Sequence, residues 1–479
     1  MIYDAIIIGG GLGGLFAGAK LSKEGMKVLL IEQHDRPGGC ATTFARKDFT
    51  LEVGLHEMDG LHATDGKIKI FNDLELFESV NFLAVPEFYR FLHADIDLVM
   101  PHDKDKAMAM LKNKFPDEVT GIDSYFERLT NARRINILER DKPDISVGEY
   151  LDSIFESEEL KLVLLGNLGY FHDDPYSLSL RYFSIAEGSY FNGRANFIQG
   201  GSQTLSDKLV EVIRSTGGKV LLHHKVTALE LADGRIESIR FRNIMPGQHE
   251  EIAGRAKHYI ANAALPEIAK MIDAKEGRKI QKLISSQTIG ASLLTVYFGF
   301  SKALKELGHK YYSSFVFDES VKTQKDIHSN NRDDFTKRSF TFVDYSQVDS
   351  KLAPEGKSVG AICCIDYFDD WSGLDKEEYR IKKKHVEVAF SSRLEKLIPG
   401  CQEYMEYAEV GTPKTVQRYT LNPKGAVYGF AQLPNREVPD VSGIVENLSI
   451  ASAWGKFGGG FSGAIYSGYM CAVDLLRKK

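Results

Sequence analysis

The stretch that decides the fold is Ala5-Ile6-Ile7-Ile8-Gly9-Gly10-Gly11-Leu12-Gly13-Gly14, close to the amino terminus. Its apolar run Ala5–Ile8 predicts a strand buried on both faces of a parallel sheet. The glycines that follow have the spacing G-x-G-x-x-G, with Gly9, Gly11 and Gly14 at the three glycine positions. Gly9 allows a tight turn, Gly11 lets the backbone approach a pyrophosphate, and Gly14 lets a helix pack closely on the strand.

The residues after the glycines complete a βαβ unit. Leu12 and Gly13 belong to the loop expected to bind the cofactor, and a helical stretch follows over 15–23. The N-terminus of such a helix offers N–H groups and a positive dipole end to phosphates. Residues 28–31 are again apolar and end in Glu32, whose carboxylate can accept hydrogen bonds from ribose hydroxyls. Strand, turn, helix, strand and acid in this order predict a dinucleotide site rather than a structural glycine-rich loop.

A second glycine pair distinguishes FAD from NAD. Arg36-Pro37-Gly38-Gly39-Cys40 follows Glu32 and resembles the dinucleotide-binding extension of FAD enzymes of the amine oxidase and phytoene desaturase group. NAD-binding domains usually lack it. We therefore expect FAD, with Gly38, Gly39 and Cys40 close to it.

The carboxyl-terminal residues also contain a glycine motif. A short apolar run, Leu448–Ala451, is followed by Gly458, Gly460 and Gly463 in G-x-G-x-x-G spacing and then by a helical stretch to Leu476. No second strand and acid follow, so this is not a second nucleotide site. The helix is expected to point its N-terminus at the flavin, where its dipole stabilises negative charge on the reduced ring. The cofactor contacts expected here are Ser452, Trp454, Gly459, Gly460 and Ala464.

Between the two ends the periodicity changes several times. Helical spacing begins after residue 76, residues 151–165 read as one helix, and residues 220–226 alternate as one strand. Asp233-Gly234 then predicts a hairpin turn before the strand expected at 236–241. Strands are predicted at 293–300, 340–345 and 359–367, and a helix at 381–397. We expect an α/β fold, with a discontinuous Rossmann-like FAD-binding domain and an inserted α+β substrate domain. The ranges are 1–75, 190–268 and 415–479 for FAD binding, and 76–189 and 269–414 for the substrate or cap domain.

Composition limits the class of protein. The chain has 479 residues, of which 43% are hydrophobic and 26% charged, with a formal net charge of -6, as in a soluble globular protein of at least two domains. A basic stripe for nucleic acid is absent from the sequence. The five cysteines have neither disulfide nor metal spacing, so we expect no metal site and a reducing cytoplasm. We see no signal peptide and no apolar run of ~20 residues, which leaves peripheral membrane contact open.

Read end to end, the chain resembles the phytoene desaturase, carotenoid isomerase and retinol saturase superfamily of FAD enzymes. Arg418-Tyr419-Thr420-Leu421-Asn422-Pro423-Lys424-Gly425 is similar to a signature of that superfamily. Glu52-Val53-Gly54-Leu55-His56 and Gly39-Cys40-Ala41-Thr42-Thr43-Phe44 are similar to motifs of the retinol saturase branch. Ser452 and Phe457 depart from the common pattern, in which glycine and proline stand at these places.

The resemblance implies chemistry at carbon–carbon double bonds of a long isoprenoid, carotenoid or retinoid-like lipid. It also implies that Gly54 lies near the flavin and Val226 beside the adenine. His56 is then the best candidate for handling a proton, and Tyr419 a second catalytic candidate that could line the cavity. Either side chain could instead be purely structural. We expect Cys40 to pack rather than to react, because no neighbouring cation in the sequence lowers its pKa.

Three functions remain open at this stage. The first is saturation, desaturation or isomerisation of lipid double bonds, with the saturase-like motifs favouring reduction. The second is flavin amine oxidation, and the third is a prenyl-lipid-binding chaperone that does no catalysis. Only one complete dinucleotide site is visible, so quinone, oxygen or a redox protein is the expected electron partner.

Overall fold

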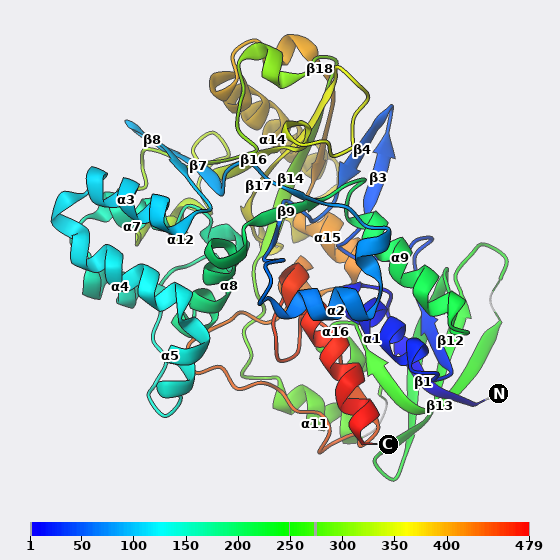
Figure 1. Ribbon diagram of the computed structural model, residues 1–479. Helices are drawn as coiled ribbons and strands as arrows, with labels where there is room; N and C mark the ends of the chain where they lie inside the picture. The colour runs from blue at the N-terminus through cyan, green and yellow to red at the C-terminus, as the bar shows by residue number, and fades with distance from the viewer. Residues whose placement is uncertain (1, 249, 273–274, 479) are drawn as a thin grey trace.

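The computed structural model describes residues 2–248, 250–272 and 275–478, and Figure 1 shows its arrangement. One large sheet lies close to both chain termini, and a second lies at the opposite end of the molecule (Figure 1). A lobe of helices flanks the second sheet. The predicted α/β architecture of the amine oxidase and phytoene desaturase type is confirmed.

The first sheet contains the dinucleotide-type unit predicted at the amino terminus. Strand β1 (Ile2–Ile8) runs parallel to β2 (Val28–Ile31) on one side and to β13 (Glu251–Ala261) on the other. β10 (Lys219–Leu221) extends the sheet beyond β2, and β19 (Leu448–Ile450) pairs with β13, both in parallel. Four segments far apart in the sequence thus share one sheet. All of β2 and the last four residues of β1 are buried, which accounts for their apolar runs.

The two faces of this sheet are covered differently. Helices α1 (Leu12–Lys23), α9 (Ser202–Ser215) and α16 (Gly460–Arg477) pack on the face that Ile7 and Leu30 share. Beyond β13 the sheet continues with the antiparallel hairpin of β12 (Arg235–Asn243) and β11 (His224–Ala232). On the opposite face, this hairpin packs with two short helices, α10 (Leu265–Lys270) and α11 (Lys275–Leu283).

The hairpin confirms one local prediction and corrects another. Asp233 and Gly234 have φ angles of 47° and 77°, the left-handed values that a type I′ hairpin turn requires. Residues 220–226, however, are not one strand. His223 has a φ of 57° and turns the chain, so β10 pairs with β2 while β11 pairs with β12.

The second sheet has the strand order β18-β14-β17-β16-β15-β7-β8 and is antiparallel except where β15 meets β7. The three predicted strands are present as β14 (Ser292–Phe300), β16 (Phe340–Asp344) and β17 (Ser358–Asp366). The remaining bounds are β7 (Tyr89–His93), β8 (Ile96–Met100), β15 (Ser313–Val316) and β18 (Met405–Gly411). Helix α14 (Lys376–Leu397) packs its Val386, Phe390 and Leu394 against one face of this sheet.

A helical lobe and several small elements complete the fold (Figure 1). The lobe comprises α3 (Lys104–Lys114), α4 (Val119–Thr130), α5 (Ala132–Leu138), α6 (Val147–Ile154), α7 (Glu158–Leu164) and α8 (Leu180–Gly193). The small strands are β3 (Thr43–Arg46), β4 (Phe49–Glu52), β5 (Met58–Asp59), β6 (Phe82–Ala84) and β9 (Ala195–Ile198). The short helices are α2 (Gly66–Asp73), α12 (Asp326–Asn330), α13 (Asp369–Ser372) and α15 (Pro413–Thr420).

The prediction of one helix over 151–165 is wrong. Phe155 is extended, with φ -132° and ψ 138°, and the hydroxyl of Ser157 accepts a hydrogen bond from the N–H of Leu160 to start α7. The division of the chain into two domains with the ranges given above stays a prediction. Among the described helices, none is both long and apolar enough to span a bilayer.

Candidate active site

The loop between β1 and α1 brings bare backbone to the place expected for a phosphate. Gly9 has a φ of 98°, and a Cβ atom there would lie 2.7 Å from the carbonyl oxygen of Asn262. Helix α1 starts after Gly11 with no side-chain cap and no acidic residue in its first turn. Because no side chain caps these N–H groups, the N-terminus of α1 suits an anionic group.

The carboxylate of Glu32 is held rigidly at the end of β2. It is 6% exposed, and its oxygens accept hydrogen bonds from the N–H of Gly10 at 2.6 Å and of His34 at 2.8 Å. These bonds fix the carboxylate directly beside the glycine-rich loop. Strand β11, which carries Val226, begins next to it, since the N–H of His224 donates to the carbonyl oxygen of Glu32 at 2.9 Å.

The two glycine motifs meet where α1 crosses α16. A Cβ atom on Gly13 would lie 1.7 Å from the carbonyl oxygen of Ala451, and one on Gly468 would lie 2.0 Å from the carbonyl oxygen of Gly13. Both positions therefore exclude any side chain. Helix α16, which follows the carboxyl-terminal motif, thus packs directly on the start of α1. That this motif contributes to the amino-terminal site, in place of a second nucleotide site, stays a prediction.

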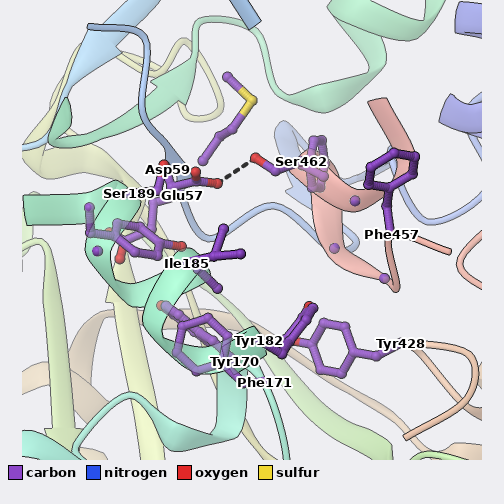
Figure 2. Close-up of a pocket in the computed structure, with 18 of the residues that line it drawn as sticks. Glu57, Asp59, Tyr170, Phe171, Tyr182, Ile185, Ser189, Tyr428, Phe457 and Ser462 are labelled. Carbon is purple, nitrogen blue, oxygen red and sulfur yellow. Dashed lines mark hydrogen bonds between the residues drawn. The ribbon is translucent and has the colours of Figure 1, made fainter. Parts of the chain in front are cut away.

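A cavity of about 650 Å³ opens beside the N-terminus of α16. Its wall is drawn from the loop before β5, from α5 and α8, from β14 and β17, and from the first turn of α16. In Figure 2, Glu57, Asp59 and Ser462 lie along one edge of it, and Tyr170, Phe171 and Tyr182 lie along the opposite edge. The cavity thus has a polar edge and an aromatic edge, with Tyr428 and Phe457 beside them (Figure 2).

A buried ion cluster supports the polar edge. The ammonium of Lys67, on a side chain only 2% exposed, lies 3.0 Å from the carboxylate of Asp59 and 2.9 Å from that of Asp65. Ser462 of α16 donates its hydroxyl to Asp59, and Tyr466 donates its hydroxyl to Asp65 at 3.0 Å. Burial opposes the charged form of Lys67, but the two carboxylates outweigh it and raise its pKa. The cluster ties the start of α16 to α2.

His56 is half-buried and lines the cavity, where the sequence expected it. Its ring packs edge-on against Tyr170, with 5.7 Å between the ring centroids. Burial lowers the pKa of His56 to about 4, so the imidazole is neutral near pH 7. A neutral imidazole can accept a proton or a hydrogen bond, but it holds no proton to give as an imidazolium.

Tyr419 does not line the cavity, contrary to the expectation from the sequence, and its catalytic role stays a prediction. The residue is 55% exposed on α15, and its ring lies 5.7 Å from that of His34. Its carbonyl oxygen also contacts the imidazole of His34. The helix that carries the signature turns this side chain to the surface.

Two residues expected to contact the cofactor, Trp454 and Ser452, are buried and contact other protein groups. Trp454 is 2% exposed and stacks edge-on against Phe430 at 4.8 Å, away from the residues that line the cavity. Ser452 is buried and donates its hydroxyl to the carbonyl oxygen of Ala263 at 3.2 Å. Contacts of Trp454 and Ser452 with the cofactor stay predictions.

Several other residues predicted to bind the cofactor lie at the cavity, on α16 or at the glycine-rich loop. Gly54, Gly459 and Gly460 line the cavity, and Ala464 lies on the second turn of α16. Gly38 bridges to Gly11, and burial raises the pKa of the Cys40 thiol to about 11, which suits packing rather than nucleophilic attack. Contacts of Leu12, Gly14, Gly39 and Val226 with the cofactor stay predictions.

The sequence reading missed the charged residues of the cavity. Lys67 stands in an ordinary polar stretch, and only its tertiary partners make it a buried ion. Glu57 and Asp59 follow His56 directly, so a run of acids beside a motif expected at the flavin was the available signal.

Comparison with known proteins gives the family. Residues 12–476 match the family described as flavin containing amine oxidoreductase. The chain belongs to this family. It is an FAD-dependent oxidoreductase, and it is a member of the phytoene desaturase, carotenoid isomerase and retinol saturase superfamily.

Curated relatives and solved structures agree with this membership. All-trans-retinol 13,14-reductase of Danio rerio is 27% identical over 89% of this chain and 77% of its own length. Prolycopene isomerase 2 of an Oncidium hybrid cultivar is 25% identical over 98% of this chain and 83% of its own length. Among solved structures, a triple mutant of putrescine oxidase superposes with a TM-score of 0.67 at 16% identity, covering 100% of this chain and 99% of its own. The likeness to putrescine oxidase, at 16% identity, shows a shared fold only.

The residues present in this member of the family fit FAD. The uncapped N-terminus of α1 suits the pyrophosphate, the fixed carboxylate of Glu32 suits a ribose, and the N-terminus of α16 opens on a cavity large enough for a ring system. When bound, FAD supplies hydride transfer at its ring. The protein supplies binding, orientation and the handling of protons.

Proposed function

We propose that this enzyme acts on carbon–carbon double bonds of a long, apolar isoprenoid, carotenoid or retinoid-like lipid. The observation that carries the proposal is the aromatic edge of the cavity at the start of α16, formed by Tyr170, Phe171 and Tyr182. Such a wall favours a flat, conjugated, apolar molecule. The named activities of the reductase and isomerase relatives support the same substrate class, and the retinol saturase-like motifs favour reduction.

His56 is proposed to accept a hydrogen bond or a proton at this site. Its imidazole and that of His62 both line the cavity, and the lowered pKa of His56 keeps its imidazole neutral. Replacement of His56 by alanine is expected to slow turnover while FAD stays bound. Turnover equal to that of the wild type would end its proposed role.

The proposed function is tested by anaerobic incubation of the enzyme with a panel of polyenes, starting from both oxidised and reduced flavin. Bleaching or recovery of the flavin band reports electron transfer, and product mass distinguishes the three reactions. A gain of two hydrogens indicates saturation, a loss of two indicates desaturation, and an unchanged mass with altered retention time indicates isomerisation. If no polyene is changed, while amines added in the presence of oxygen yield hydrogen peroxide, the enzyme is an amine oxidase instead.

The electron partner is proposed to be quinone, oxygen or a redox protein, since the sequence shows one complete dinucleotide motif. Contact with a membrane surface and a cytoplasmic location stay predictions. Quinone-dependent reoxidation, followed by the flavin band under nitrogen, tests the first of these partners.

A further inference from the structure

Three buried carboxyl groups lie near one another behind the polar edge of the cavity: Glu57, Glu87 and Glu187. They are 8%, 8% and 1% exposed. Glu87 accepts hydrogen bonds from the N–H groups of Tyr312 and Ser313, and Glu187 accepts one from the side-chain amide of Asn167 at 2.7 Å. Glu57 differs, because neither of its carboxyl oxygens makes a hydrogen bond within the described part of the chain.

Glu57 also differs in position. It contributes to the cavity wall, as Glu87 and Glu187 do not, and it directly follows His56 on the loop before β5 (Figure 2). The hydroxyl of Tyr170, on the opposite edge, is likewise buried without a partner. A buried polar group without a partner destabilises a fold, so proteins keep few of them. The site has kept two such groups at one cavity.

We propose that Glu57 is the acid of this site, carrying one proton that it gives to a substrate carbon when a double bond is reduced. The inference rests on the proposed function. In the step, Glu57 gives its proton to one carbon of the double bond, and bound reduced FAD would supply the hydride for the other. The double bond becomes a single bond, FAD is left oxidised, and Glu57 is left as a carboxylate that regains a proton from water.

The electrostatics of the site agree with this assignment. Burial first, and then the charges of Glu87 and Glu187, raise the pKa of Glu57 well above its ordinary value. Four tyrosines also lie within electrostatic range of Glu57: Tyr170, Tyr190, Tyr312 and Tyr345. The opposite directions of the two pKa shifts favour the proton on Glu57 over the neighbouring His56. After the proton is given up, burial of the carboxylate favours its return.

Other proton carriers of the cavity wall fit this role less well. Lys67 holds its protons between two carboxylates, which stabilise the charged form. Burial raises the pKa of the Cys363 thiol to about 12, which makes it a weak acid. Tyr170 has a pKa far above its ordinary value, so it is better suited to relay or orient than to supply a proton.

The test compares Glu57→Gln with Glu187→Gln. Glutamine has the shape of the protonated acid but cannot give up a proton, and Glu187 is an equally buried carboxyl outside the cavity wall, with its pKa raised to about 8 by burial. Each variant is loaded with FAD, reduced with dithionite under nitrogen, and mixed with the polyene that the wild type reduces. Flavin reoxidation is expected to slow on the order of 100-fold or more in Glu57→Gln and less than about threefold in Glu187→Gln, from the size of general acid catalysis.

Two further measurements distinguish a loss of proton transfer from damage to the fold or to the FAD site. FAD content and the change of the oxidised flavin spectrum on binding the polyene are expected to match the wild type in both variants. Because ionisation of a buried acid costs stability as pH rises above its unfolded pKa, the melting temperature of each variant relative to wild type is expected to increase from pH 6 to pH 9. Glu57→Asp, which keeps an acid, is expected to regain part of the rate.

Glu57→Leu is a second test variant. It is expected to fold, because replacing an unpartnered buried carboxyl by an apolar group stabilises the folded state. It is expected to bind FAD and to be as slow as Glu57→Gln. Reoxidation within threefold of wild type in either variant overturns the assignment of Glu57 and leaves the proposed function standing. A wild type that changes no polyene overturns the proposed function, and the role of Glu57 with it.

Discussion

Lys67 is the residue through which the stability of this site can be tested most sharply. Its ammonium lies between Asp59 and Asp65 at 3.0 and 2.9 Å, with 2% of the side chain exposed. Replacing it by methionine keeps much of the volume but leaves two carboxylates at the base of α16 with no cation between them. Breaking a buried pair in this way costs about 3–5 kcal/mol. That is roughly a hundred- to several-thousand-fold in the unfolding equilibrium.

The matched control is Lys384→Met on α14. Lys384 lies 2.7 Å from Glu387 in an exposed i,i+3 pair, with side chains 63% and 31% exposed. Such pairs contribute about 0.3–0.5 kcal/mol. Urea unfolding would be followed by both tryptophan and flavin fluorescence, because coincident transitions are needed before midpoints are converted to free energies.

Adding Asp65→Asn to Lys67→Met is expected to recover part of the loss. The asparagine removes one unpaired charge, and it can still cap α2 as Asp65 does by accepting the N–H of residue 67 at 2.9 Å. If Lys67→Met is no worse than Lys384→Met, or if the double variant is less stable than the single one, the buried cluster does not hold the site together.

The same cluster predicts a pH dependence whose sign follows from two pKa shifts. Burial opposes ionisation of Asp65, but Lys67 outweighs it, so the pKa of Asp65 lies below its ordinary value of 3.8. The stabilisation that the Asp65 carboxylate contributes to the fold is present above that pH and is lost as the pH falls below it. The pKa of Lys67 is raised above 10.5, so its contribution is present below that value and is lost as pH rises. The stability difference between wild type and Lys67→Met is therefore expected to be flat between these limits and to shrink outside them.

Three further outcomes are expected. Glu32→Ala should weaken FAD binding at least tenfold, measured by flavin fluorescence on dilution, because a fixed ribose acceptor is lost; retention equal to wild type contradicts the assignment. Gly468→Ala should lower stability by about 1–3 kcal/mol or more, because its Cβ would meet Gly13, whereas Gly443→Ala, which meets nothing within 4 Å, should not. Tyr419→Ala should keep turnover within about twofold, as expected of an exposed side chain, and a large loss of kcat would support its catalytic role.

The ends of the molecule could be predicted from the sequence because their signals are local. A buried parallel strand leaves an apolar run, as in Ala5–Ile8, and a phosphate loop needs glycines at fixed spacing. The hairpin turn at Asp233-Gly234 is read in the same way. Each of these signals lies within a few residues of the structure that it specifies.

The middle of the chain could not be read as well because its structure is set by distant partners. The β7–β8 hairpin joins the second sheet through parallel pairing of β7 with β15, more than 200 residues away in the chain. The alternation of residues 220–226 persists through His223, although that residue turns the chain between two strands. Tyr419 stands in a recognisable signature, yet the orientation of α15 puts its side chain at the surface.

The proton-handling residues show the same limit at the active site. His56 and Glu57 are adjacent, and their ordinary pKa values would put the proton on the histidine. Burial lowers the pKa of His56, while burial with Glu87 and Glu187 raises that of Glu57, so the order is reversed. The reversal depends on residues 30 and 130 positions further along the chain, which no local pattern relates to this loop. A motif can therefore locate the loop that handles protons, but the tertiary fold decides which of its residues carries one.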